Sequence, residues 1–357
     1  MTLLLSNEEI EGILDVGRCV ALLEEAYLDL AQGAATSGLR SEVAAPSSQP
    51  RSLYALKAYC AAYPRREVAA LRLTSDLLTW TQVEGGKMRQ KVPAAPGGRW
   101  VGLILLFSTR TGEPLALFPD GVIQRTRVGV TSALALRILA RGDATELAIV
   151  GSGWQAGAHA QAACAVRRFR RVRVYSPNRA HRERFCATWE KTLGVPFQPV
   201  ESLAMAVRGA DAIQCATNSM QPLLEADSLE PGLHVGVIRV AEVGNDVLAR
   251  ADIVVRHATP EHAAHQALSS PEFTELSSDR GWTGSATDRL QGLPELTDLL
   301  VGRTPGRTRP EEITCFLNNG GIGLQFAVLG HAVWERAREL GVGRELPTDW
   351  FTEVVHP

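Results

Sequence analysis

Three glycines near the middle of the chain have the spacing of a phosphate-binding turn. Gly151, Gly153 and Gly157 form the pattern G-x-G-x-x-G between an apolar run at 147–150 and a segment with helical periodicity. Such glycines allow a tight turn, close approach of the backbone to a pyrophosphate and close packing of helix on strand. The helix N-terminus adds N–H groups that favour phosphate. The predicted contacts are Gly151, Ser152, Gly153, Trp154, Gln155 and Gly157. The alternative is a glycine-rich turn that binds no ligand.

The residues after the next strand bear on which dinucleotide would bind. A strand at 172–175 is followed by Ser176, Asn178 and Arg179, without the Asp or Glu that would bind the ribose hydroxyls of NAD. A hydroxyl, an amide and a guanidinium suit a 2′-phosphate, with Arg179 as its natural partner. We therefore favour NADP(H) as the cofactor, with NAD(H) as the other possibility. The alternative for Arg179 is that it begins the next helix and faces solvent.

A third cofactor element follows the strand at 212–216. Thr217, Asn218 and Ser219 are small and polar, and residues of this kind at the carboxyl end of a Rossmann strand line the crevice that holds the ligand. The alternative is an ordinary turn.

The elements around these residues alternate as in an α/β fold. Buried strands separated by helical segments are typical of βαβ units and a parallel sheet. The strands are expected at 146–150, 172–175, 212–216, 234–238 and 253–256. Further helices are expected at 127–140, 155–168 and 323–340.

The N-terminal part has a different pattern. Ser6 followed by Glu9 fits a capping box, and Asp15 is placed to cap a second helix, so that 6–32 is predicted to be helical. Strand-like runs follow, and the polar stretch 81–99 is predicted to be a long loop. The runs are 53–60, 68–73 and 101–107, with a turn at 109–114.

These patterns predict an α/β protein of two domains, since 357 residues exceed one typical core. One would be a Rossmann domain with a doubly wound parallel sheet, at 127–310. The other would be a discontinuous α+β domain, built from 1–126 and 311–357.

Composition excludes several classes of protein. The net charge of -2 with no basic run argues against nucleic acid as a partner, and no apolar segment is long enough for a membrane helix. The six cysteines form no Cys-x-x-Cys pair, so we expect a reduced, cytoplasmic protein without disulfides. His257, Glu261, His262 and His265 have poor spacing for zinc, and we predict no metal.

Several segments together resemble the ornithine cyclodeaminase/μ-crystallin family. Arg127-Val128-Gly129-Val130-Thr131-Ser132-Ala133 is similar to the family signature Arg-Thr-Ala-Ala-x-Ser-Ala. The other similar segments are 3–10, 111–117, 151–157 and 230–234. The resemblance implies a homodimer in which the domain of 1–126 and 311–357 serves substrate binding and dimerisation. It also implies hydride exchange at a carbon beside a carboxylate. Activities in the family include cyclising deamination, amino acid dehydrogenation and imine reduction.

The family binds the substrate carboxylate with cations, which the resemblance carries over to this chain. The signature arginine is Arg127, and the N-terminal arginine is Arg40. Arg72 stands where the family has a lysine, and Lys57 is the other candidate for that role. The predicted catalytic residues are Arg72, Lys57 and Arg127, and the predicted substrate-binding residues are Arg40, Arg72 and Arg127. The resemblance also adds Thr131, Val237, Asn318 and Asn319 to the cofactor contacts.

The chain departs from the cyclodeaminases at two places. The aspartate that serves their ring closure has no counterpart in 235–243. Arginine at position 72 can hold a carboxylate but cannot exchange a proton as lysine can. Both departures argue against ornithine cyclisation and leave hydride transfer intact.

The sequence therefore predicts an NAD(P)H-dependent oxidoreductase that reduces an imine beside a carboxylate or interconverts a 2-oxo acid and an amino acid. The substrate would be a small imine, amine or amino acid, and Lys57 or bound water would donate the proton. Two alternatives stay open: a redox-neutral cyclodeaminase that retains NAD, and a μ-crystallin-like protein that binds NADPH and a small ligand without turnover.

Overall fold

The computed structural model describes residues 1–50, 52–83, 86–93, 98–219, 221–258, 262–266 and 290–354. Within these ranges, the side chains of 80–90 and 262–266 are outside the description. Glu261 and the side chains of His262 and His265, named above as a weak metal pattern, therefore lie outside the described residues.

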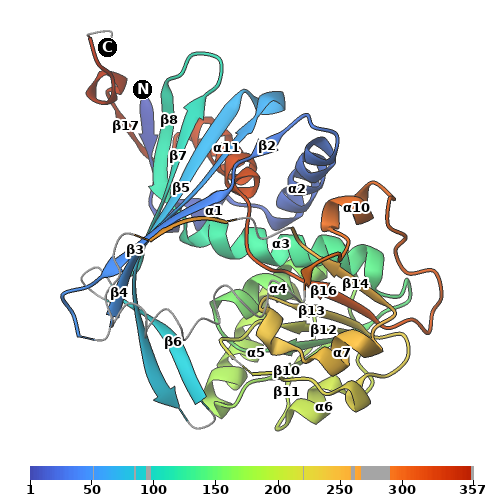
Figure 1. Ribbon diagram of the computed structural model, residues 1–357. Helices are drawn as coiled ribbons and strands as arrows, with labels where there is room; N and C mark the ends of the chain where they lie inside the picture. The colour runs from blue at the N-terminus through green and yellow to red at the C-terminus, as the bar shows by residue number, and fades with distance from the viewer. Residues whose placement is uncertain are drawn as a thin grey trace.

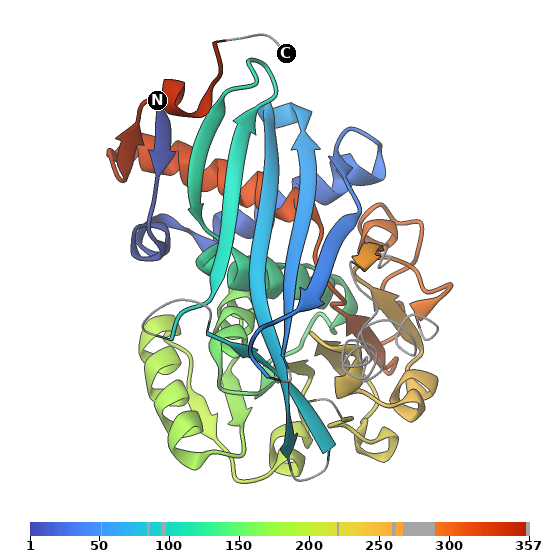
Figure 2. The ribbon, with the colours of Figure 1, turned by 60° about the vertical axis from the view of Figure 1, so that its left-hand side comes forward.

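A ten-stranded mixed sheet forms one half of the molecule (Figures 1 and 2). Its main path runs β15-β3-β4-β5-β7-β8-β1-β17, while β2 pairs with β4 and β6 pairs with β5. The strands are β1 (Thr2–Leu4), β2 (Thr36–Ser37), β3 (Arg40–Pro46), β4 (Ser52–Tyr63), β5 (Val68–Val83), β6 (Gly86–Val92), β7 (Val101–Ser108), β8 (Pro114–Pro119), β15 (His262–Gln266) and β17 (Arg344–Leu346).

A seven-stranded parallel sheet forms the other half. Its order is β11-β10-β9-β12-β13-β16-β14, so consecutive βαβ units run in opposite directions from β9. The strands are β9 (Glu146–Val150), β10 (Arg171–Tyr175), β11 (Phe197–Pro199), β12 (Ala212–Cys215), β13 (His234–Val237), β14 (Ile253–Arg256) and β16 (Thr314–Leu317). This doubly wound arrangement confirms the predicted fold class.

The helices cover the sheets, and α3 joins the two halves. The helices are α1 (Asn7–Ile13), α2 (Val16–Ala31), α3 (Gly121–Leu139), α4 (Trp154–Val166), α5 (Arg179–Leu193), α6 (Leu203–Val207), α7 (Asn245–Arg250), α10 (Leu296–Leu300) and α11 (Gly323–Leu340). Helix α3 is buried on almost every side, because it packs on α2 and α11 in one half and on α4 in the other (Figure 1). Its first turns can therefore reach both sheets.

Local signals in the sequence predicted most of these elements. The capping box of α1 is present: the Ser6 hydroxyl accepts from Glu9 N at 3.2 Å, and the Glu9 carboxylate accepts from Ser6 N at 2.7 Å. Asp15 caps α2, and α11 spans the predicted residues. The prediction of a loop at 81–99 was wrong, because β5 continues to Val83 and pairs with β6 in an antiparallel hairpin.

The predicted domain limits lie between residues 126 and 127 and between residues 310 and 311. They can be compared with the sheet to which each strand belongs. Strand β16 lies C-terminal to residue 311 and pairs within the parallel sheet, whereas β15 joins β3 of the ten-stranded sheet. Among the described residues, no helix is both long and apolar enough to cross a membrane.

Candidate functional site

The glycine turn lies where the strand order of the parallel sheet reverses. Strand β9 ends at Val150, and the chain turns at Gly151 with a φ of 117°, which favours glycine. A Cβ at this position would lie 2.5 Å from the carbonyl oxygen of Ala216, which follows the neighbouring strand β12. Ligands of doubly wound sheets bind at this reversal, outside the carboxyl ends of the strands.

The N-terminus of α4 is open toward this crevice. Its N-cap, Gly153, offers no side-chain cap, and a Cβ there would have no heavy atom within 4 Å. The first N–H groups of the helix are thus available to an anion, which fits the pyrophosphate of a dinucleotide. Gly157 packs α4 against α5, since a Cβ there would overlap the Trp189 ring.

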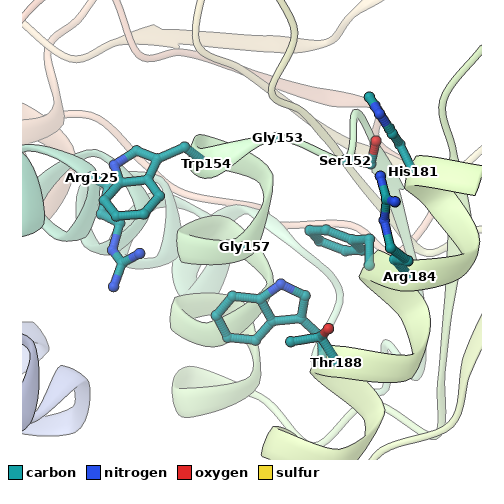
Figure 3. Close-up of a pocket in the computed structure, with 10 residues that line it drawn as sticks. Arg125, Ser152, Gly153, Trp154, Gly157, His181, Arg184 and Thr188 are labelled. Carbon is teal, nitrogen blue, oxygen red and sulfur yellow. The ribbon is translucent and has the colours of Figure 1, made fainter. Parts of the chain in front are cut away.

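A cavity of about 470 Å³ adjoins the turn between α4 and α5 (Figure 3). Trp154 forms one end of it and stacks on Arg125, whose guanidinium carbon is 3.9 Å from the ring centroid. His181 and Arg184 lie near Ser152 at the opposite end. The lining residues are Arg125, Ser152, Gly153, Trp154, Gly157, His181, Arg184, Phe185, Thr188 and Trp189. The surroundings of the turn are therefore cationic and aromatic.

The end of β10 carries the residues predicted to select the cofactor. Ser152 donates a hydrogen bond to the Ser176 hydroxyl at 2.9 Å, which ties this strand end to the glycine turn. Asn178 caps α5 by accepting from His181 N at 3.0 Å. The Arg179 side chain is 74% exposed and pairs with Glu183 at 2.7 Å. No acid occupies the end of β10, and Arg179 can reorient toward the crevice without breaking a buried contact.

Buried Glu242 joins the loops that follow β12 and β13. Its Oε1 accepts from Thr217 N at 2.8 Å and from the Thr217 hydroxyl at 2.6 Å. Its Oε2 accepts from the N–H groups of Ile238 and Arg239, each at 3.0 Å. Burial raises the pKa of Glu242. Through Thr217, Glu242 therefore holds the segment of Thr217, Asn218 and Ser219 in place. The sequence patterns had not singled out Glu242.

Asn318 brings the end of β16 against α3. Its side-chain amide donates to the Val128 carbonyl and to the Ser132 hydroxyl, each at 2.9 Å. Its Oδ1 is buried and has no hydrogen-bond partner in the described part of the chain, as expected of an atom that would accept from a bound cofactor. Asn318 N donates to the carbonyl of Val237, and the Val237 side chain is buried. Asn319 is already engaged, because its amide binds Ala258 O at 2.8 Å and its Oδ1 accepts from His257 N at 3.1 Å.

Thr131 is fully buried in a polar network rather than at the crevice surface. Its hydroxyl donates to Arg127 O at 2.7 Å and lies 2.9 Å from the hydroxyl of Tyr27. His257 Nε2 lies 2.8 Å from the same Tyr27 hydroxyl, and His257 Nδ1 lies 3.0 Å from Gly320 O. Burial lowers the pKa of His257 to about 4. Among the described residues, no group of His, Cys, Asp and Glu is arranged to hold a metal ion.

The three arginines predicted for the substrate converge on one aromatic pair. Tyr59 on β4 and Phe326 on α11 have ring centroids 6.1 Å apart. Arg40 from β3 lies 5.9 Å from the Tyr59 centroid, and Arg72 from β5 lies 5.3 Å from it. Arg127 from α3 lies 5.6 Å from the Phe326 centroid, and Arg72 lies 5.0 Å from it. Five elements, β3, β4, β5, α3 and α11, thus build one cationic site.

Three of the four cations in this region have a carboxylate partner. Arg40 pairs with Glu42. Lys57 Nζ lies 3.0 Å from Asp76 Oδ2. Arg72 donates to Asp120 Oδ2 through Nε at 2.8 Å and through Nη2 at 2.6 Å. Asp76 is itself buried beside Lys57.

Arg127 differs because its hydrogen-bond partners within the described chain are neutral. Its guanidinium donates to Gln124 Oε1 at 2.9 and 2.8 Å, and to Gly320 O and Gln325 Oε1 at 3.3 Å each. Burial lowers its pKa to about 10 although the nearby charge of Asp120 opposes this shift, so the cation is desolvated and no described carboxylate forms an ion pair with it. Val128, the next residue, receives Asn318 at the edge of the parallel sheet. The uncompensated cation therefore lies beside the predicted cofactor crevice.

Burial lowers the pKa of Lys57 to about 8, although Asp76 opposes this shift.

The sequence analysis missed two groups of residues in the site. Asp120, just before α3, could have been noticed as an acid at a helix start. Tyr27 and Gln325 carried no local signal, since Gln325 meets Arg127, and Tyr27 meets Gln325, only through tertiary packing.

Comparisons with known proteins agree with this geometry. The sequence model of the ornithine cyclodeaminase/mu-crystallin family matches residues 2–341. A Delta(1)-pyrroline-2-carboxylate reductase from Bacillus cereus is 28% identical over 250 residues, which are 69% of this chain and 74% of the relative. An NAD(P)H-dependent anabolic L-arginine dehydrogenase from Pseudomonas aeruginosa is 29% identical over 273 residues, covering 74% of this chain and 81% of the relative.

A solved structure shares the fold over the whole length. The Delta(1)-pyrroline-2-carboxylate reductase of Thermococcus litoralis, in complex with NADH and L-proline, has a TM-score of 0.75 and 24% identity, and the alignment covers 97% of this chain and 100% of that one. The resemblance seen in the signature and the glycine turn is thus confirmed across both sheets. The chain belongs to the ornithine cyclodeaminase/mu-crystallin family.

Proposed function

We propose that the protein is an NAD(P)H-dependent oxidoreductase that reduces the C=N bond of an imine beside a carboxylate. The observation that carries this proposal is the position of Arg127, a buried cation without a carboxylate partner among the described residues, one residue from the Asn318 contact at the crevice edge. A substrate carboxylate at Arg127 would supply the missing charge. It would also place the adjacent carbon near the carboxyl ends of the parallel strands.

The bound cofactor would supply a hydride to the imine carbon, and a proton would complete the reduction at nitrogen. The residues present fit the dinucleotide: the open N-terminus of α4 suits its pyrophosphate, and the unpartnered Asn318 Oδ1 suits an amide donor. Much of the rate would come from positioning of the two reactants. Arg72 and Arg40 would add positive potential around the carboxylate, each already balanced by its own acid.

The proton donor we propose is Lys57. Its ammonium group is buried, and its pKa of about 8 lies close to neutral pH, as suits a general acid. Asp76 contacts this ammonium and keeps it charged below that pH. Bound water is the alternative donor.

We propose NADP(H) as the preferred cofactor. The support is the absence of an acid at the end of β10, the exposed Arg179 beside it, and the Arg184 guanidinium, which lines the same pocket as Ser152 and His181. A 2′-phosphate would meet a cationic surface there.

The test is oxidation of the reduced cofactor followed at 340 nm. NADPH and NADH are offered in parallel with cyclic imine carboxylates and with 2-oxo acids plus ammonia or alkylamines. Turnover with one of these substrates supports the proposal. Ammonia release from ornithine or lysine without net cofactor oxidation would replace it with a cyclodeaminase. Silence in both assays, with NADPH still bound, would favour a binding protein.

We also propose a homodimer formed through the ten-stranded sheet, in a reducing compartment such as the cytoplasm. The face of this sheet opposite to α11 is bare in Figure 2 and presents Val43, Tyr54, Leu56 and Leu103, each more than a third exposed. Val43 pairs with Leu56 across two strands, so these side chains share that face. An apolar patch of this kind marks an interface. Sedimentation equilibrium should show a dimer, and Leu56→Arg should dissociate it, whereas Leu340→Arg, at the exposed last residue of α11, should not.

A further inference from the structure

Neutral groups orient the guanidinium of Arg127, and further hydrogen bonds fix the orientation of those groups. Gln325 presents Oε1 to Arg127 Nη1 at 3.3 Å, and the same oxygen accepts from Ile322 N at 3.1 Å. Gly320 O is shared by Arg127 Nη1 at 3.3 Å and His257 Nδ1 at 3.0 Å. A Cβ at Gly321 would lie 2.5 Å from Nη1, so the backbone packs directly against the guanidinium.

Tyr27 and Thr131 decide which end of the Gln325 amide faces Arg127. The Gln325 nitrogen donates to the Tyr27 hydroxyl at 2.9 Å and to the Thr131 hydroxyl at 2.8 Å. The Thr131 hydroxyl donates its one proton to Arg127 O, so its oxygen accepts the hydrogen bond from Gln325. With both donors of the amide engaged, the carbonyl end must point at Arg127. A flipped amide would place N–H groups against a cation.

The network draws on both halves of the molecule. Tyr27 comes from α2, Thr131 from α3, Gln325 from α11, and His257 from the end of β14 in the parallel sheet. The Tyr27 and His257 rings meet edge to face with centroids 5.6 Å apart. Tyr27 and Gln325 are almost fully inaccessible to solvent, so neither can touch the substrate. Their effect on the reaction must pass through Arg127.

We propose that Tyr27 and Gln325 are positioning residues. They hold the Arg127 cation in a cage of neutral groups and orient it for the substrate carboxylate. This inference rests on the proposed carboxylate binding at Arg127. The cage supplies dipoles instead of a carboxylate, so the desolvated charge stays available to the substrate. A carboxylate in the cage would compete with the substrate carboxylate for this charge.

The decisive variant is Gln325→Glu. The new carboxylate would lie at the position of the Gln325 carbonyl oxygen, within ion-pair distance of Arg127. The thermal midpoint is measured alongside, so that the kinetic constants are compared on folded protein. We expect the KM for the imine or 2-oxo acid to rise about 10- to 100-fold, as for the loss of a charge-assisted contact, while kcat and the KM for the cofactor change less than about threefold. A KM for the substrate that does not change would overturn the proposal.

Tyr27→Phe tests the same cage without adding charge. It removes the hydroxyl that accepts from Gln325, so the amide can flip and we expect the substrate KM to rise about tenfold. The matched control is Tyr63→Phe, which also removes a buried tyrosine hydroxyl. This hydroxyl donates to Asp29 Oδ2 on α2 at 3.0 Å and takes no part in the described hydrogen bonds around Arg127. Equal effects of the two tyrosine variants on KM would mean that Tyr27 is only structural.

A binding measurement separates this inference from the proposed activity. Titration calorimetry with pyrrole-2-carboxylate, a planar carboxylate that cannot accept a hydride, is run on the cofactor-saturated wild type and on both variants. Weaker binding in Gln325→Glu and Tyr27→Phe supports the positioning role even if no substrate of the panel turns over. Equal dissociation constants in all three proteins would overturn the positioning role, whether or not the enzyme reduces imines.

Discussion

Arg72 on β5 donates two hydrogen bonds to a single oxygen of Asp120, the residue before α3. The pair is buried, and Gly102 on β7 makes room for it, because a Cβ at Gly102 would overlap the Asp120 carboxylate. The charge of Arg72 is thus compensated within the fold, which distinguishes it from Arg127. Of Arg72 and Arg127, Arg127 is the one whose charge the substrate would have to balance.

Replacement of Arg127 should weaken binding of the substrate rather than binding of the cofactor. For Arg127→Met we expect a loss of about 10- to 100-fold in kcat/KM for the imine, because charge-assisted hydrogen bonds contribute about 1.5–3 kcal/mol each. The measurement is steady-state kinetics at saturating NADPH. Arg137→Met is the control, since Arg137 lies on the same helix and pairs with Glu24 away from the site. An unchanged kcat/KM in Arg127→Met would exclude Arg127 as the carboxylate anchor.

Loss of Asp120 should show in stability. Asp120→Ala leaves Arg72 buried without its carboxylate, which costs about 3–5 kcal/mol. The Asp120 side chain makes no capping hydrogen bond to α3, so no cap is lost with it. We expect a clear fall in the thermal midpoint followed by circular dichroism. Asp143→Ala, at a side chain that is 81% exposed, should leave the midpoint within about 1 °C. Similar midpoints for both variants would show that the buried pair contributes little.

The reaction should slow at alkaline pH if Lys57 donates the proton. Burial lowers the pKa of Lys57 to about 8, and the charged groups around it are Asp76, Glu42 and Arg40. The donor is protonated below that pH and lost above it, so kcat should be level below about pH 8 and fall as the pH rises further. Lys57→Met should lose most of the activity together with this break. Lys91→Met, which touches Asp76 from an exposed position, should keep it. A wild-type profile that is level to pH 10 would instead assign the proton to water.

The cofactor preference should depend on Arg179. In Arg179→Gln we expect the KM for NADPH to rise about 10- to 100-fold, because a guanidinium–phosphate contact is lost, while the KM for NADH stays within about twofold. Arg336→Gln is a matched control, because Arg336 is also exposed and pairs with a glutamate on its own helix. Parallel changes for both cofactors would indicate that Arg179 does not read the 2′-phosphate.

Much of the fold could be predicted from residues close together in the chain. The capping box of Ser6 and Glu9, the cap at Asp15 and the limits of α11 depend on hydrogen bonds within one or two turns. The glycine turn after β9 likewise follows from local spacing. The hairpin of β5 and β6 was missed, because its polar sequence reads as a loop and its strands are defined by pairing with each other.

The sequence by itself determined which residue types were available for chemistry: a phosphate-binding turn, a strand end without an acid, and several cations in the family's pattern. Only the tertiary structure decided which of those cations has a partner. The pairing of Arg72 with Asp120 spans 48 residues and requires the register of β5 on β7 together with the start of α3. The neutral surroundings of Arg127 arise where α2, α3 and α11 meet. Electrostatic compensation depends on distances in space, and no local pattern encodes those distances.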